Sequence, residues 1–304
     1  MTEVCEKAQP ELQEVTIQSL LSTGAHYGHT TTSWCPKMAP YLYGTKSVNK
    51  RSRGTKNVYI FNLDLTLRLW RRARKAIVDN AAAGGSILFV GTKPQSREII
   101  RREALRSGSP FVDYKWVGGL LTNEKTVRQS INKMTEIENL LAAHKDTESN
   151  IRLTKKEALL MQRDLDKLDK KFGGIRGKSA PTMMFVIDTA RNHIAIEEAQ
   201  ALDIPIVAIT DSNSDPDNID YIIPANDDAT GALNLLISNV ADAVLEGKGL
   251  ATDASMLEER AMLEEYDFSE GVRGAILDPP GGSDPQISKT PADKEEIEVI
   301  YKPS

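Results

Sequence analysis

The sequence predicts an α/β fold, in which a doubly wound, parallel, five-stranded sheet carries an inserted α-helical hairpin. Short, unbroken apolar runs such as 87–90 and 183–187 alternate with helical segments, as in a parallel sheet covered on both faces. Residues 120–175 interrupt this alternation with two apolar stripes at near-heptad spacing, which is typical of paired helices. The predicted organisation is a disordered N-terminus (1–15), a sheet domain (16–119 and 176–246), the inserted hairpin (120–175) and an acidic, largely disordered tail (247–304).

Before the alternation begins, the chain is expected to be mostly irregular. A short helix is predicted over 16–23 and ends at Gly24, a residue type that favours helix C-termini. Residues 25–44 contain two prolines and no regular periodicity. Residues 45–57 are rich in Lys, Arg, Ser and Asn, so we expect them to form a mobile basic loop.

The sheet domain is expected to begin at residue 58. Predicted strands cover 58–63, 86–90, 111–112, 182–187, 205–210 and 220–223, with five of them in the core sheet. Predicted helices cover 65–83, 94–107, 190–202 and 227–246, the second of which has a proline in its first turn. One further helix could extend as far as Tyr266 before the disordered part of the tail.

The hairpin is predicted from the spacing of its apolar residues. Residues of the two stripes recur every three or four positions, so each stripe lies on one side of a helix. A polar linker at 144–152 joins the two helices, which are expected to pack antiparallel along one seam. The seam residues are Val127, Ile131, Met134, Ile137 and Leu141 on the first helix, and Ala158, Met161, Leu165, Leu168 and Phe172 on the second.

Composition excludes several classes of protein. The 304 residues are 40% hydrophobic and 27% charged, as in an average soluble domain, and no apolar run is long enough to cross a bilayer. The two cysteines, Cys5 and Cys35, form neither a disulfide framework nor a paired zinc motif. The acidic N-terminus resembles neither a secretory signal nor a mitochondrial presequence, which favours a cytoplasmic protein.

Charge is distributed unevenly along the chain. Residues 1–180 hold 31 Lys and Arg against 18 Asp and Glu, whereas residues 181–304 hold 7 against 25. A basic half of this density is typical of a protein that binds a polyanion, although solvated basic faces also occur. The candidate RNA-binding residues are Lys37, Lys46, Lys50, Arg51, Arg53, Lys56, Arg68, Arg71, Arg72, Lys75, Lys93, Arg97, Arg101, Arg102, Lys115 and Arg128.

Acidic side chains gather where predicted strands end. Asp188, Asp211 and Asp215 follow two parallel strands, and together with His29 they are candidate ligands for a structural divalent ion. The alternative is that Asp211–Asp215 forms a hydrogen-bonded turn and that His29 packs or hydrogen-bonds. No catalytic nucleophile and no nucleotide-binding glycine motif is present, so no other cofactor is expected.

Two local features leave alternatives open. Gly91-Thr92-Lys93 precedes a predicted helix and is either a plain strand-to-helix turn or a site for an RNA phosphate. Trp116 either stacks on a base or, as its apolar neighbours favour, is buried at the root of the hairpin.

Several of these stretches together resemble the small-subunit ribosomal protein S2 family of bacteria and organelles. The resemblance covers about residues 16–246 in one collinear order. It is carried by 20–29 (LLSTGAHYGH), 34–38 (WCPKM), 87–93 (ILFVGTK), 116–123 (WVGGLLTN), 125–131 (KTVRQSI), 153–158 (LTKKEA), 185–188 (FVID), 193–199 (HIAIEEA), 210–216 (TDSNSDP) and 223–228 (IPANDD).

The resemblance implies a flavodoxin-like domain with a protruding α-hairpin and no catalysis. It also implies a structural role in the small ribosomal subunit, with contacts to small-subunit rRNA and to other small-subunit proteins, including ribosomal protein S1, and none to a membrane. Such a protein is ribosome-bound in the cytoplasm, or in an organelle matrix if it is organelle-encoded. The basic stretch 45–57 is longer than the family pattern, and the acidic tail exceeds the usual core, so we expect the tail to face solvent or a protein.

Two other functions compete with the ribosomal one. One is a phosphohydrolase or nucleotide-binding protein that uses Asp188, Asp211 and Asp215 with a divalent ion. The absence of a phosphate-binding glycine pattern argues against it, as does a basic surface larger than one pocket. The other is a coiled-coil adaptor whose hairpin binds a partner protein, which is compatible with the ribosomal role.

Overall fold

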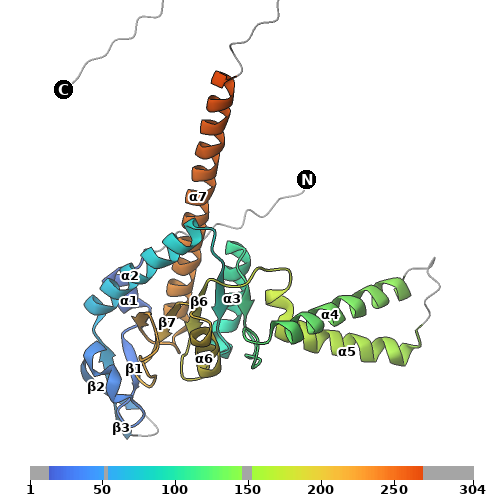
Figure 1. Ribbon diagram of the computed structural model, residues 1–304. Coiled ribbons are helices and arrows are strands. Elements are labelled where there is room, and N and C mark those ends of the chain that lie inside the picture. The colour runs from blue at the N-terminus through green and yellow to red at the C-terminus, as the bar shows by residue number, and fades with distance from the viewer. Residues whose placement is uncertain (1–13, 51–53, 146–152, 270–304) are drawn as a thin grey trace, which may run out of the picture. The chain divides into compact units, whose positions relative to one another are not determined.

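The computed structural model describes residues 14–50, 54–145 and 153–269 (Figure 1). The predicted disorder at 1–13 and 270–304 and most of the hairpin linker therefore lie outside the described residues. The chain divides into two units, Met1–Leu257 and Glu258–Ser304. The last helix, α7 (Thr230–Ser269), is continuous, so it extends well beyond the predicted end at residue 246. Among the described residues, no helix combines the length and apolar character needed to cross a membrane.

A five-stranded sheet forms the centre of the first unit, and all of its strands are parallel. Its order is β5 (Phe111–Val112), β4 (Ile87–Val90), β6 (Met183–Ile187), β7 (Ile206–Thr210) and β8 (Tyr221–Pro224). Every residue of β4, β6 and β7 is buried, as expected for strands covered on both faces. The predicted α/β fold with a parallel five-stranded sheet is confirmed, and it is consistent with a flavodoxin-like fold.

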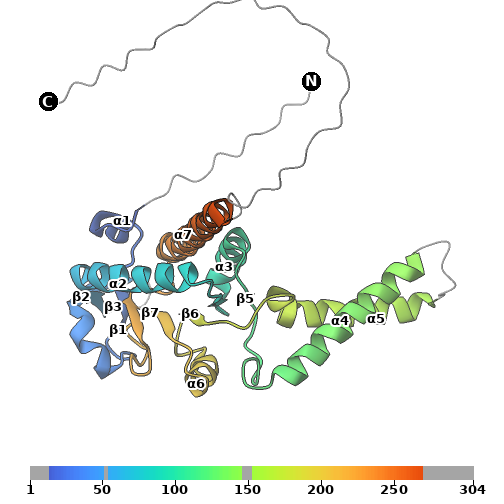
Figure 2. The ribbon, with the colours of Figure 1, turned by 45° about the horizontal axis from the view of Figure 1, so that its top comes forward.

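Helices cover both faces of this sheet (Figure 2). Residues Ile87 and Phe89 of β4 belong to a core that includes α2 (Leu63–Ala82), α3 (Pro94–Ser107) and the first part of α7. The alternate residues of the same strand, Leu88 and Val90, belong to a second core with α6 (His193–Ala201). The period of two along a strand thus divides its apolar side chains between two helical layers.

Residues 14–50 and 54–61 are more regular than the sequence predicts. A second sheet has the antiparallel order β1 (Tyr27–Thr30), β3 (Gly54–Phe61) and β2 (Leu42–Lys50), preceded by the helix α1 (Ile17–Ser22), and a 3-10 helix (Pro36–Tyr41) lies between β1 and β2. The prediction of an irregular segment at 25–44 is therefore wrong. So is the prediction of a basic loop at 45–57, except for 51–53, which lie outside the described residues. The strand predicted at 58–63 belongs to this sheet. Antiparallel strands with one solvated face tolerate the polar residues that suggested a loop.

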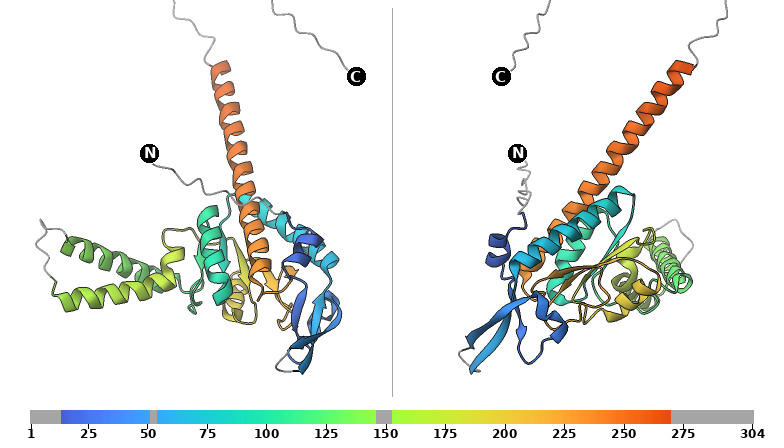
Figure 3. Two further views of the ribbon diagram at one scale, coloured as in Figure 1. Left: turned by 180° about the vertical axis from the view of Figure 1, so that it is seen from behind. Right: turned by 60° about the vertical axis from the view of Figure 1, so that its left-hand side comes forward.

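Two long helices, α4 (Glu124–Lys145) and α5 (Lys155–Phe172), lie side by side (Figure 3). The side chains of Met134, Ile137 and Leu141 on α4 are buried, and so is Phe172 at the end of α5. Thr154 caps α5 by accepting a hydrogen bond from the Glu157 amide, while the Glu157 carboxylate accepts one from the Thr154 amide. The remaining predicted seam residues are half-buried, so the stripes face away from solvent.

Candidate nucleic-acid interface and acidic cluster

The helix α2 separates its apolar and basic residues cleanly. Its buried side chains include Trp70, Ala73 and Ile77, which pack on the sheet core. The predicted basic residues on the opposite side are all exposed, and in the described part of the chain none forms an ion pair with a carboxylate: Arg68, Arg71, Arg72 and Lys75. Four uncompensated cations on one rigid helix form a surface suited to a phosphate backbone. We call these four residues the α2 cationic face.

The β2–β3 hairpin extends the region of positive charge. Between Glu14 and Asp64 the sequence contains no acidic residue. Lys46 on β2 is exposed, and its Nζ lies 5.6 Å from the centroid of the Tyr27 ring. Lys50 and Lys56 lie in strands β2 and β3, whereas the predicted contacts Arg51 and Arg53 fall outside the described residues.

Other predicted RNA-binding residues interact with the protein itself. On α3, Arg97 donates hydrogen bonds to the carbonyl oxygens of Thr92 and Tyr114, Arg101 lies 3.9 Å from Asp113, and Arg102 pairs with Glu103 at 2.9 Å. Further pairs are Lys37 with Asp215 and Asp217, and Arg128 with Glu124. Lys115 is exposed and forms no ion pair within the residues described. Carboxylate partners thus compete with phosphate for several candidates, whereas none of the carboxylates in the described residues pairs with the α2 cationic face. There Arg68 donates only to the carbonyl oxygen of Asp64, and the Arg72 guanidinium lies 5.6 Å from the centroid of the Tyr221 ring.

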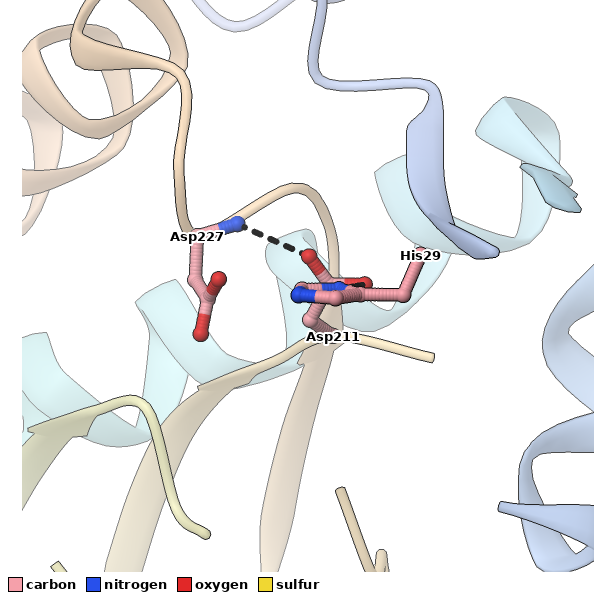
Figure 4. A group of neighbouring side chains, drawn as sticks. All are labelled: His29, Asp211 and Asp227. Carbon is pink, nitrogen blue, oxygen red and sulfur yellow. Dashed lines mark hydrogen bonds and ion pairs between the residues drawn. The ribbon is translucent and has the colours of Figure 1, made fainter. Parts of the chain in front are cut away.

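A cluster of acidic residues lies at the carboxyl ends of the parallel strands (Figure 4). Asp211 follows β7 and is fully buried, and Asp227 follows β8 and is also buried. The amide of Asp227 donates to Oδ2 of Asp211 over 3.3 Å. His29 reaches this cluster from β1, with its Nδ1 3.1 Å from Oδ1 of Asp211 and its Nε2 3.6 Å from Oδ2 of Asp228.

A glycine allows His29 to approach so closely. A Cβ atom on Gly28 would lie 2.8 Å from the Ser212 hydroxyl oxygen, so a side chain at that position would push β1 away from the turn that follows β7. The same hydroxyl accepts a hydrogen bond of 2.7 Å from the His29 amide. The close contact of Gly28 with Ser212 therefore places the imidazole beside Asp211.

Lys93 is part of this cluster and not of the basic surface. Its Nζ lies 2.6 Å from Asp227, 2.6 Å from Asp228 and 3.5 Å from Asp188, and its side chain is only 14% exposed. The turn at Gly91-Thr92-Lys93 thus directs its lysine toward protein carboxylates. The Lys93 ammonium group, a predicted contact for RNA phosphate, is paired with these carboxylates instead.

The pKa values of Asp227, His29 and Lys93 in this cluster are all raised. Burial and the negative charge of Asp211 raise the pKa of Asp227 to about 7, although Lys93 opposes this. The hydrogen bond with Asp211 raises the pKa of His29 above its usual value, against the effect of burial. Burial lowers the pKa of Lys93, but the contacts with Asp227 and Asp228 outweigh it and raise that pKa overall. The cluster therefore holds protons around neutral pH.

The residues that could hold a metal ion differ from the predicted set. His29, Asp211 and Asp227 each offer a ligand atom, and these atoms lie within 4.8 Å of one another, a donor set suited to a divalent cation. Of the other predicted ligands, Asp188 contacts Lys93, and Asp215 is exposed and pairs with Lys37. Asp227 was not among the predicted ligands. It follows the apolar run 221–224, however, just as Asp211 follows its own predicted strand, so the same pattern would have indicated it.

A second buried carboxylate, that of Glu198, binds the loop that leads into α4. Trp116 is buried, as its apolar neighbours favour, and its indole Nε1 donates to Glu198 over 3.0 Å. The amides of Gly119, Leu121 and Thr122 donate to the same carboxylate over 2.7, 3.0 and 3.3 Å. Burial raises the pKa of Glu198, but these hydrogen bonds outweigh that effect and lower it overall.

Comparison with known proteins identifies the family. The model of the family described as Ribosomal protein S2 matches residues 20–247. The small ribosomal subunit protein uS2 of Geotalea uraniireducens (strain Rf4) is 42% identical over 263 residues, which cover 86% of this chain and 97% of that protein. The protein of the same name from Lawsonia intracellularis (strain PHE/MN1-00) is 43% identical over 240 residues, covering 79% and 78%. The chain therefore belongs to the ribosomal protein S2 family, which is structural and non-enzymatic.

Proposed function

We propose that this chain is a structural constituent of the small ribosomal subunit, where it binds rRNA through the α2 cationic face and the β2–β3 hairpin. The relatives from Geotalea and Lawsonia are small ribosomal subunit proteins by name, which supports a ribosome-bound location and partners among rRNA and ribosomal proteins. The hypothesis of a metal-dependent phosphohydrolase is wrong, because the family is non-enzymatic.

The observation that carries the RNA-binding proposal is that no carboxylate of residues 14–50, 54–145 and 153–269 pairs with the α2 cationic face. Each phosphate that a lysine or arginine contacts releases condensed counterions, so affinity depends on the number of free cations and falls with salt. Arg74, on the same helix, pairs with Glu246 and is therefore not counted among them. Because α2 is packed on the sheet core, the backbone positions from which its four cations project are also fixed.

The test replaces Arg68, Arg71, Arg72 and Lys75 together with glutamine. We expect the fraction of this variant that sediments with small subunits to fall, and to fall further as salt is raised. If all four residues contact phosphates, the slope of log affinity against log salt decreases by roughly 4, since each contact contributes about one unit. The measurement is sucrose-gradient sedimentation of lysates that contain the full-length chain.

The matched control changes four exposed cations elsewhere. Lys155, Lys156, Arg163 and Lys170 on α5 are exposed, and replacing them with glutamine makes the same change in net charge. The control is expected to sediment like the unchanged chain. Equal loss in both variants would show that net charge and not the α2 cationic face determines binding.

We also propose that the paired helices α4 and α5 help to hold a neighbouring ribosomal protein, for which S1 is the candidate. Three leucines on these helices are exposed by 37%, 53% and 49%, namely Leu140, Leu159 and Leu160. Exposed apolar side chains of this kind are suited to a protein partner and not to RNA. Replacing the three with serine is expected to reduce the amount of S1 on small subunits while leaving this chain bound. Unchanged S1 content would refute this proposal.

A further inference from the structure

A hollow of about 460 Å³ lies where three neighbouring strands of the parallel sheet end. Thr92 follows β4, Tyr114 and Lys115 follow β5, and Arg191 and Asn192 follow β6. Its size is in the range of small-molecule sites in proteins, about 300–1,000 Å³. We call it the switch-point pocket, for the topology that creates it.

The topology of the sheet opens a crevice at this position. Strands β4 and β6 are neighbours, but the chain leaves β4 through α3 toward β5 and leaves β6 through α6 toward β7, in opposite directions. In open α/β sheets, ligands bind where neighbouring connections diverge in this way. Both helices begin at this edge, so the partial positive charge of two N-termini favours an anion there.

Three cations line the pocket, and none of its lining residues is acidic. Arg97, Lys115 and Arg191 come from three different segments, and within the described residues none of them forms an ion pair with a carboxylate. The partners of the Arg97 guanidinium are the neutral carbonyl oxygens of Thr92 and Tyr114. No carboxylate in the described part of the chain therefore pairs with its positive charge.

An aromatic surface accompanies the cations. The ring of Tyr114 is 44% exposed, and the Arg97 guanidinium carbon lies 4.7 Å from its centroid. A planar guanidinium and an aromatic ring provide the surfaces on which nucleic acid bases stack, and arginine and lysine side chains bind phosphate. The pocket therefore offers groups suited to a phosphate and a surface suited to a base.

We propose that the switch-point pocket binds a phosphorylated nucleotide, whose phosphate contacts Lys115 and Arg191 and whose base stacks on Tyr114. The nucleotide is either free or a nucleotide of RNA turned out of its stack. No linear glycine motif signals this site, because its cations come from three separate segments: helix α3, the loop after β5 and the turn after β6. The pocket holds the nucleotide without catalysing a reaction on it.

The first experiment titrates the full-length chain with adenosine 5′-monophosphate and follows binding by calorimetry. We expect saturable binding that is weakened at least about tenfold when Lys115 and Arg191 are both replaced with glutamine, since two charge-assisted contacts are lost. The control variant replaces Arg163 and Lys170, both exposed on α5, with glutamine and is expected to bind like the unchanged chain. No binding to the unchanged chain, or equal binding to all three chains, would overturn the proposal.

A second variant separates base stacking from phosphate binding. Tyr114→Leu is expected to bind inorganic phosphate as the unchanged chain does, but to lose most of the additional affinity that the adenosine moiety provides. If Tyr114→Leu binds adenosine 5′-monophosphate with full affinity, the stacking role of Tyr114 is refuted.

The source of the nucleotide is determined on the ribosome, and only this step rests on the proposed function. If the occupant is RNA, the Lys115→Gln, Arg191→Gln variant is released from small subunits at lower salt than the unchanged chain. If the occupant is a free nucleotide, release is unchanged while binding of adenosine 5′-monophosphate is lost. Because the titration uses the isolated chain, failure of the pocket is distinguishable from failure of the α2 cationic face.

Discussion

Two regions of the molecule contain buried carboxylates and stabilise them in different ways. Glu198 is surrounded by N–H donors from Trp116 and from the backbone of 119–122, with no cation in the set. Asp211 and Asp227, by contrast, are close to each other, and their compensation comes from two cationic side chains, Lys93 and His29. The first site lowers the pKa of its acid, and the second raises the pKa of Asp227.

The comparison shows why equally buried acids have different physical roles. Hydrogen bonds from fixed backbone amides stabilise the ionised form of Glu198, so this site keeps its charge at neutral pH and fixes the loop that leads into α4. The like charges of Asp211 and Asp227 disfavour full ionisation, so the second site exchanges protons near neutral pH. The first region therefore keeps its charge around neutral pH, whereas the ionisation of the second depends on pH.

The largest loss in free energy of unfolding is expected when Lys93, which pairs with the buried acids, is replaced. Lys93→Met leaves Asp227 and Asp188 without their shared cation, and breaking a buried ion pair in this way costs about 3–5 kcal/mol. We expect the loss in free energy of unfolding to be greater at pH 8 than at pH 5, because Asp227 is largely protonated at the lower pH. Urea denaturation of the full-length chain at both pH values measures it.

Lys75→Met is the control for this change. Lys75 is exposed and makes no ion pair in the described part of the chain, so its loss is expected to alter stability by less than about 0.5 kcal/mol. Equal effects at positions 93 and 75 would show that the acid cluster does not depend on its lysine.

The next largest loss in free energy of unfolding is expected when Glu198 is replaced. Glu198→Gln replaces one carboxylate oxygen with an NH₂ group that faces N–H donors, so buried amides lose an acceptor and unfolding becomes easier by about 2–4 kcal/mol. In contrast to Lys93→Met, the loss is expected to be the same at pH 6 and pH 8, because the pKa of Glu198 is lowered. Urea denaturation at the two pH values provides the measurement.

The adjacent residue supplies the comparison variant. Glu197 is exposed, and its side chain makes no hydrogen bond to the described residues, so Glu197→Gln is expected to be neutral. A strong pH dependence in Glu198→Gln would contradict the distinction between the two regions.

The parallel sheet could be predicted from sequence because its signal is local. Strands such as β6 and β7 are fully buried, so their runs of apolar residues are continuous and unambiguous. The antiparallel strand β2 and the first part of β3 were not predicted, since residues 45–57 are rich in Lys, Ser, Thr and Asn, the same types that fill loops. Cross-strand pairing, such as Thr45 with Tyr59, specifies these strands and is not visible in a local window.

The candidate site was predictable only in part, for a similar reason. The basic face of α2 follows from helical periodicity alone, so its four cations could be identified. Whether a cation is free depends on partners distant in sequence, as with Lys93 and Asp227, which are 134 residues apart. Neither that pair nor the pocket lined by Arg97, Lys115 and Arg191 has a signature of sequence spacing.

A smaller effect is expected in the pH dependence of stability. The pKa of Asp227 is raised in the folded chain to about 7, so folding takes up a proton and the free energy of unfolding falls as pH rises from about 4 to 7. The raised pKa of His29 acts in the same direction, with its contribution lost as pH rises above 6.5 through the folded value. The lowered pKa of Glu198 acts oppositely, and only below about pH 4.5.

Asp227→Asn is therefore expected to flatten the slope of stability against pH between pH 5 and 7. The slope that it removes is at most about 1.4 kcal/mol per pH unit, the value for one proton. Glu198→Gln is expected to leave this slope unchanged. Urea midpoints measured at half-unit steps of pH distinguish the two variants, and an unaltered slope in Asp227→Asn would assign the pH dependence to other groups.

The smallest effect is expected at an ion pair that resembles the acid cluster in composition but not in burial. Lys37 contacts Asp215 and Asp217 at 2.7 and 2.5 Å, as Lys93 contacts its acids, but all three side chains are more than half exposed. Water and salt screen such a pair, so Lys37→Met is expected to leave the urea midpoint unchanged within error, at low and at high salt. A loss comparable to that of Lys93→Met would mean that contact geometry, and not burial, makes the acid cluster depend on its lysine.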